Sequence, residues 1–131
     1  MKIFSASFLI CILFSIGCSP PPTNIVSGGT AGSLIAGDLP LPDFEVKVHD
    51  AADLNLLGFG TTGNDGRFQL VQSKGDAPLV LTPGNYVMTL ASIGPAAPRI
   101  SQAYTNASKS SLKVAWKPED RTLDLKIPAI K

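Results

Sequence analysis

The sequence is poor in the residues that perform most enzyme and metal chemistry. Its 131 residues include two cysteines and one histidine, His49. Cys11 lies inside an apolar N-terminal run and Cys18 directly follows it, so we expect no disulfide, thiol nucleophile or cysteine metal site in the folded domain. A single histidine cannot build a multi-histidine zinc site. We therefore predict no catalytic residues, no metal and no cofactor.

The chain also lacks an excess of either charge. Eleven basic and ten acidic residues give a net charge of +1, and the balance falls to zero if Lys2 is removed with the N-terminal segment. This balance gives no electrostatic reason to expect a nucleic acid partner. Glycine and proline are frequent, at 12 and 11 residues, but stay below the level typical of disordered chains. Their frequency favours a domain of short strands and turns.

The N-terminal segment has the pattern of an export signal. After Lys2, residues 3–16 form an uncharged and mostly apolar run, which is shorter than the roughly 20 residues that span a bilayer. The sequence Ser15-Ile16-Gly17-Cys18 resembles the lipobox of bacterial lipoproteins, whose cysteine becomes the lipidated mature N-terminus. The resemblance implies that Cys18 carries acyl chains such as palmitate and that a membrane of the bacterial cell envelope is a partner. The alternative is an ordinary secretory signal with an incidental cysteine.

Three segments follow from this interpretation. Residues 1–17 are the signal peptide, and residues 18–29 form a lipidated, proline-rich tether that contains Pro20, Pro21 and Pro22. Residues 30–131 are the folded domain, which is too short for two independent cores.

Within the domain, apolar and polar residues alternate with the period of a β-strand. Val46 and Val48, for example, alternate with Lys47 and His49, so one face of the strand is expected to be buried and the other solvated. The same analysis places Trp116 and Tyr86 in the core and leaves Tyr104 as the aromatic residue most open to solvent. The pattern predicts seven strands, at residues 31–36, 44–50, 57–62, 67–72, 86–92, 112–116 and 122–127. We predict an all-β fold, a seven-stranded antiparallel β-sandwich.

Turn residues suggest how the strands connect. Asn64-Asp65-Gly66 predicts a hairpin between residues 58–62 and 67–71, in which the Asp-Gly pair is more readily explained as a turn than as a calcium site. Residues 118–121 predict a second hairpin, between the last two strands. Residues 99–117 lack glycine and proline but are rich in serine, so they leave room for only a short helical turn.

Several motifs resemble carboxypeptidase regulatory-like domains, which have a transthyretin-like (prealbumin-like) sandwich. They are Gly32 to Gly37 followed by Pro40-Leu41-Pro42, then Thr62 with Asn64 to Phe68, then Pro83-Gly84-Asn85-Tyr86. Ile100, Tyr104, Ser110 and Leu112 are spaced as in small planctomycete lipoproteins of this type, with Ser101 where those have proline. The resemblance covers about residues 30–127. It implies an extracytoplasmic accessory or binding module and carries over no catalytic residues.

Two classes of function remain. The first is a membrane-anchored, non-catalytic binding or structural module of the cell envelope, with an envelope protein or a polysaccharide as possible partner and no assigned ligand residues. The alternative is a small envelope hydrolase or transferase built on loop residues near His49, namely Asp50, Asp53 and Ser73. An enzyme would require these groups to converge in a cleft. We predict the first class, because nothing in the sequence brings the four residues together.

Overall fold

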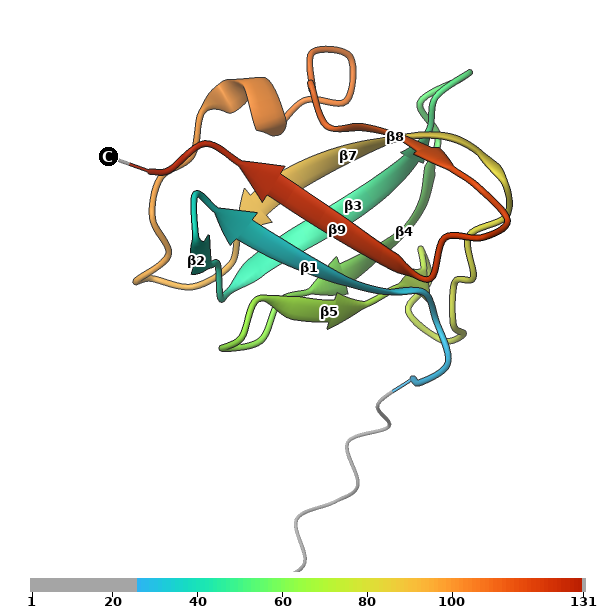
Figure 1. Ribbon diagram of the computed structural model, residues 1–131, viewed down its shortest axis with the longest axis horizontal. Coiled ribbons are helices and arrows are strands. Elements are labelled where there is room, and N and C mark those ends of the chain that lie inside the picture. Colours follow the sequence, from blue (N-terminus) through green and yellow to red (C-terminus); the bar gives the residue numbers. More distant parts are fainter. Residues whose placement is uncertain (1–25, 131) are drawn as a thin grey trace, which may run out of the picture.

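The computed structural model describes residues 26–130 as two β-sheets packed face to face (Figure 1). The predicted signal peptide, Cys18 and most of the predicted tether lie outside these residues. The strands are β1 (Ala31–Ala36), β2 (Leu39–Pro40), β3 (Phe44–Asp50), β4 (Leu56–Thr61), β5 (Arg67–Gln69), β6 (Val71–Gln72), β7 (Gly84–Ser92), β8 (Lys113–Trp116) and β9 (Thr122–Ile127). Among the described residues, no helix is long and apolar enough to cross a membrane. The described residues form strands and no α-helix, so the all-β class is confirmed.

One sheet is wide and the other is built around β1. The wide sheet has the order β6-β4-β3-β7-β8 and is antiparallel throughout. In the second sheet, β1 pairs with β5 and β2 along one side and with β9 along the other. The pairing of β1 with β9 is parallel, so the prediction of an antiparallel sandwich is wrong for this pair.

The core lies between the sheets and is formed by the predicted apolar faces. Val46 and Val48 are fully buried, whereas Glu45 and Lys47 lie on the outer face and approach each other at 3.6 Å. Trp116 is 8% exposed and the neighbouring Lys113 is exposed, as the alternation predicts. In a strand whose side chains alternate between core and solvent, a shift of the pairing register by one residue would move the apolar side chains to the solvent face. The alternation therefore restricts the register.

The predicted hairpin between the last two strands is wrong. β8 pairs with β7, whereas β9 crosses to the other sheet and pairs with β1. The segment between β8 and β9 forms a turn, in which the backbone N–H of Lys117 donates to Asp120 Oδ2 at 2.8 Å. The alternating pattern is compatible with either arrangement, because Trp116 and Leu123 reach the same core from opposite sheets.

The predicted strand at residues 67–72 divides into two. β5 joins β1 in one sheet and β6 joins β4 in the other, and the change occurs at Leu70, whose side chain is fully buried. Because one strand cannot keep its hydrogen bonds to both sheets, the ladder is interrupted at this residue. The division of this strand, together with the short β2, gives nine strands within residues 26–130 in place of the predicted seven.

The predicted short helical turn is confirmed, and the wide sheet contains an inner strand that is buried on both faces. β7 lies between β3 and β8 and is buried on both faces over Tyr86–Leu90, as expected for an inner strand. A single 3₁₀ turn, η1 (Gln102–Tyr104), forms in the serine-rich segment, and the Ser101 side chain accepts a hydrogen bond from Ala103 N at 3.2 Å. Tyr104 is half-buried against the core and is therefore less exposed than predicted.

Candidate functional site

The candidate site is a groove at the place where the chain passes from one sheet to the other. The turn predicted at residues 63–66 is present: Gly63 N donates to Arg67 O at 2.9 Å, and Gly66 adopts a positive φ of 73°. Farther along, Phe59 of β4 pairs with Val71 of β6. A continuous hairpin would also pair Thr61 with Gln69, but β4 and β5 belong to different sheets and form no ladder pair. The predicted hairpin is therefore hydrogen-bonded at the turn and between β4 and β6, but it is unpaired between these two places.

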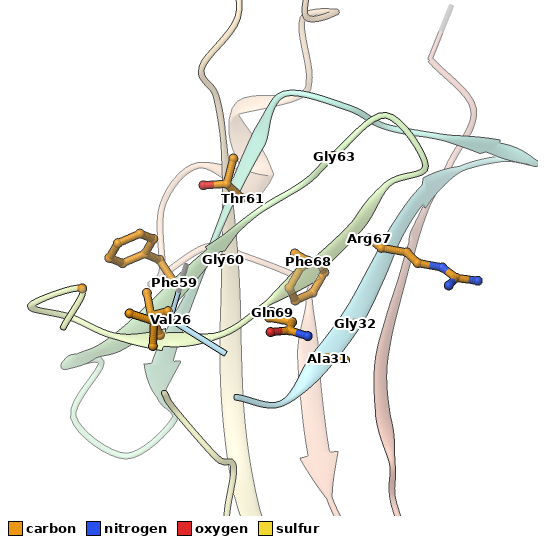
Figure 2. A pocket seen from close by; sticks show the side chains of 12 residues that line it. Val26, Ala31, Gly32, Phe59, Gly60, Thr61, Gly63, Arg67, Phe68 and Gln69 are labelled. Carbon is orange, nitrogen blue, oxygen red and sulfur yellow. The ribbon is translucent and has the colours of Figure 1, made fainter. Parts of the chain in front are cut away.

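A groove of about 670 Å³ lies beside this unpaired stretch (Figure 2). Apolar side chains of Val26, Phe59 and Val71 line it, and Figure 2 shows Val26 and Phe59 close together on one side. Polar side chains of Thr61, Arg67 and Gln69 complete the lining, and all three residues are exposed. A surface that combines apolar and polar side chains in this way is suited to binding another molecule.

Two glycines shape the floor of the groove around the buried ring of Phe68. A Cβ atom at Gly32 would lie 2.4 Å from Phe68 Cζ and 2.4 Å from the carbonyl oxygen of Leu123. A Cβ atom at Gly60 would lie 2.9 Å from Phe68 Cδ2. Both positions must therefore remain without a side chain, because the Phe68 ring occupies the space between the sheets.

The lining offers contacts but few reactive groups. Arg67 is the titratable residue of the lining, and its Nε lies 3.9 Å from Asp65 Oδ2 in the adjoining turn. Asp65 Oδ1 accepts a hydrogen bond from Arg67 N at 3.0 Å, so both oxygens of this carboxylate serve the turn. The groove can place apolar surface and hydrogen-bond donors against a bound chain or sugar ring, but it holds no general base beside a nucleophile.

His49, the centre of the alternative enzymatic hypothesis, has a structural role near the end of β3. Its Nδ1 lies 3.2 Å from the carbonyl oxygen of Leu54, and its Nε2 lies 3.0 Å from Thr89 Oγ1. Because a carbonyl oxygen only accepts, Nδ1 carries the proton of the neutral ring and Nε2 accepts from the threonine hydroxyl. The imidazole thus joins the β3–β4 loop to β7.

The other residues of that hypothesis also form hydrogen bonds with nearby backbone groups. Asp50 Oδ1 accepts from Ala52 N at 2.8 Å, and Asp53 Oδ1 accepts from Asn55 N at 3.0 Å. Ser73 lies beyond β6, where its backbone N–H donates to Leu57 O. No hydrogen bond of the described structure joins any of these residues to His49. Nor do three or more His, Cys, Asp or Glu side chains gather into a metal-binding group within residues 26–130.

Sequence reasoning missed Phe59 and with it the groove. The signal was present in Gly58-Phe59-Gly60, because two glycines at the inward positions leave the outward phenylalanine as the bulky side chain of its strand. Comparison with known proteins adds no family: no family model, no curated protein and no solved structure matches the chain.

Proposed function

We propose that this protein is a membrane-anchored lipoprotein of the bacterial cell envelope, with a non-catalytic domain that faces the periplasm or exterior and binds an envelope protein or polysaccharide. The groove between β4 and β5 is the proposed binding surface. The observation that carries the proposal is its lining, which combines apolar and polar side chains without a base and nucleophile pair. The carboxypeptidase regulatory-like, transthyretin-like identity belongs to the same proposal and rests on the sequence motifs.

The position of Val26 supports a role close to a membrane. Val26 lines the groove, so the segment that leads back to Cys18 departs from the edge of the proposed binding surface. At about 3.5 Å per residue, the chain from Cys18 to Val26 can reach roughly 28 Å at most. If Cys18 is lipidated, the groove lies within that distance of the lipid anchor. The proposed partners are therefore molecules close to the membrane surface.

The groove can be tested by filling it without disturbing the core. Thr61 is an exposed lining residue, so Thr61→Arg should block the groove and leave the fold intact. We expect capture from envelope extracts with the full-length variant to recover at least about tenfold less of the molecules that accompany the wild type. The matched control is Leu39→Arg on β2, because Leu39 is also exposed but lies outside the groove. Equal recovery by the wild type and both variants would show that the groove is not the binding surface.

The alternative, a small envelope hydrolase near His49, requires a reacting molecule to displace the hydrogen bonds described above. A cleft of about 450 Å³ beside Asp50, Ala51 and Tyr86 is the space nearest to that loop, and His49 does not line it. The structural use of both imidazole nitrogens favours the binding module.

A further inference from the structure

β9 leaves one long side of its sheet open. It pairs with β1 over its full length, from Ala31 opposite Thr122 to Ala36 opposite Ile127. Within residues 26–130 no strand pairs with its other side, and Figure 1 shows β9 as the last strand of its sheet. Exposed edges are normally blocked by proline, a bulge or an inward-pointing charge, because they can pair with another chain. Residues 122–127 contain no proline, bulge or inward-pointing charge. Their exposed charges, Asp124 and Lys126, also hinder pairing with an arbitrary chain, but they have opposite signs and can attract each other across the edge.

The backbone groups that face the open side can be identified. Ile127 O accepts a hydrogen bond from Gly37 N at 2.9 Å, so this residue directs its groups toward β1. In a parallel ladder alternate residues point their N–H and C=O groups to the same side. Thr122, Asp124 and Lys126 therefore direct theirs to the open side. No backbone hydrogen bond within the described chain uses these groups.

The side chains restrict how a second strand could pair there. Leu123, Leu125 and Ile127 face the core, whereas the other three residues of β9 are exposed. A second copy of β9 must keep the apolar residues on the core side, which limits antiparallel pairing to registers that match the faces. Centred on Asp124 or on Lys126, such a pair places like charges directly opposite each other. Centred on Leu125, it places Asp124 of each copy opposite Lys126 of the other.

We propose that two copies of this chain associate through β9, in antiparallel register about Leu125, with a two-fold axis at that residue. Asp124 of one copy and Lys126 of the other then donate a backbone N–H to each other's carbonyl oxygen, because the backbone groups of both residues face the open side. The two-fold axis creates two such pairs, and in each pair the oppositely charged side chains lie on the solvent side of the sheet and attract each other. This attraction favours the register about Leu125. The β1-containing sheets of the two copies become one continuous sheet. This inference does not depend on the lipid anchor or on the groove.

The register makes a charge-exchange test possible. Asp124→Lys places lysine opposite lysine, and Lys126→Asp places aspartate opposite aspartate, so each variant should weaken the dimer by about tenfold or more. The double variant, Asp124→Lys with Lys126→Asp, restores both opposite-charge pairs. An equimolar mixture of the two single variants should form a heterodimer, because one copy then supplies two lysines and the other two aspartates. Lys113→Asp, a reversal on β8 of the other sheet, should change nothing.

The measurement is sedimentation equilibrium of the full-length chain in density-matched detergent, across a series of protein concentrations. Thermal unfolding of each variant establishes that it is folded, which matters because Asp124 also accepts hydrogen bonds from Ser33 and Thr122. Recovery of the dimer in the double variant and in the mixture would support the proposed register. A wild type that stays monomeric at every concentration, or a dimer that persists in both single variants, would overturn the proposal.

Discussion

Leu54 has an unusual backbone for its residue type. Its φ is 60°, in the left-handed region that costs a residue with a Cβ atom about 1 to 2 kcal/mol. The loop requires this conformation, because Leu54 N donates to Asp50 O at 2.8 Å while Leu54 O accepts from His49. The hydrogen bond from His49 therefore helps to hold Leu54 in its left-handed conformation.

This strain gives the first prediction. Leu54→Gly should raise the free energy of unfolding by about 0.5 to 1 kcal/mol, since glycine adopts a positive φ without the Cβ clash. Leu56→Gly is the matched control, because Leu56 is similarly exposed, at 42% against 37%, but does not have a positive φ. In urea denaturation Leu56→Gly should be destabilised, and a loss of stability in both variants would contradict the strain argument.

The role of His49 gives the second prediction. His49→Ala removes the bonds to Leu54 O and to the buried Thr89 hydroxyl, so unfolding should become easier by about 1 to 2 kcal/mol. The purified protein should show no turnover in esterase, peptidase and glycosidase screens, with or without this substitution. Turnover by the wild type that disappears in His49→Ala would replace the binding-module proposal with the enzymatic one.

At the scale of the element, the alternation in each strand determines which side chains enter the core. The same alternation does not determine which strand pairs with which. β8 and β9 bury their apolar residues equally well as a hairpin or in opposite sheets, and the structure takes the second arrangement. The glycines of β1 and β4 carry a further requirement, since the Phe68 ring passes between the strands only where they lack side chains.

The alternation in β8 gives the third prediction. Trp116 is buried and Lys113 is exposed, so Trp116→Ala should destabilise the protein by about 3 to 5 kcal/mol and Lys113→Ala by less than about 0.5 kcal/mol. The two values come from equilibrium denaturation measured by circular dichroism. Similar losses at both positions would mean that the two faces of β8 are assigned wrongly.

At the scale of the whole molecule, the chain enters the sandwich beside the groove, and β9 lies at the edge of the sheet that is built around β1 (Figure 1). The two proposed contacts, the groove and the β9 edge, therefore lie at different places on the domain. One contact lies next to the segment that leads to Cys18, and the other lies across β1 on the open side of β9. A tethered domain with this layout can bind a partner in the groove while its β9 edge pairs with a second copy.

The anchor gives the fourth prediction. Mass spectrometry of the protein purified from its native envelope should show a diacyl or triacyl mass on Cys18 at the mature N-terminus. Cys18→Ala should leave an unprocessed precursor or release the protein from the membrane fraction. An unmodified N-terminus at any other residue of the native protein would contradict lipid anchoring.

Much of the fold follows from the order of residues alone. The period-two pattern locates most of the strands and their buried faces, because an alternating segment buries its apolar side in any sandwich. Gly66 and Ser101 likewise act on their immediate neighbours, so the turn and the 3₁₀ helix could be predicted locally.

The pairing of strands was decided by the tertiary structure. The parallel neighbour of β9, the change of sheet at Leu70 and the opening between Thr61 and Gln69 all depend on contacts between distant segments. A hydrophobic pattern specifies which face of a strand is buried but not which backbone lies beside it. The groove and the open edge arise from that choice of neighbours, so neither could be recognised before the sheets were assembled.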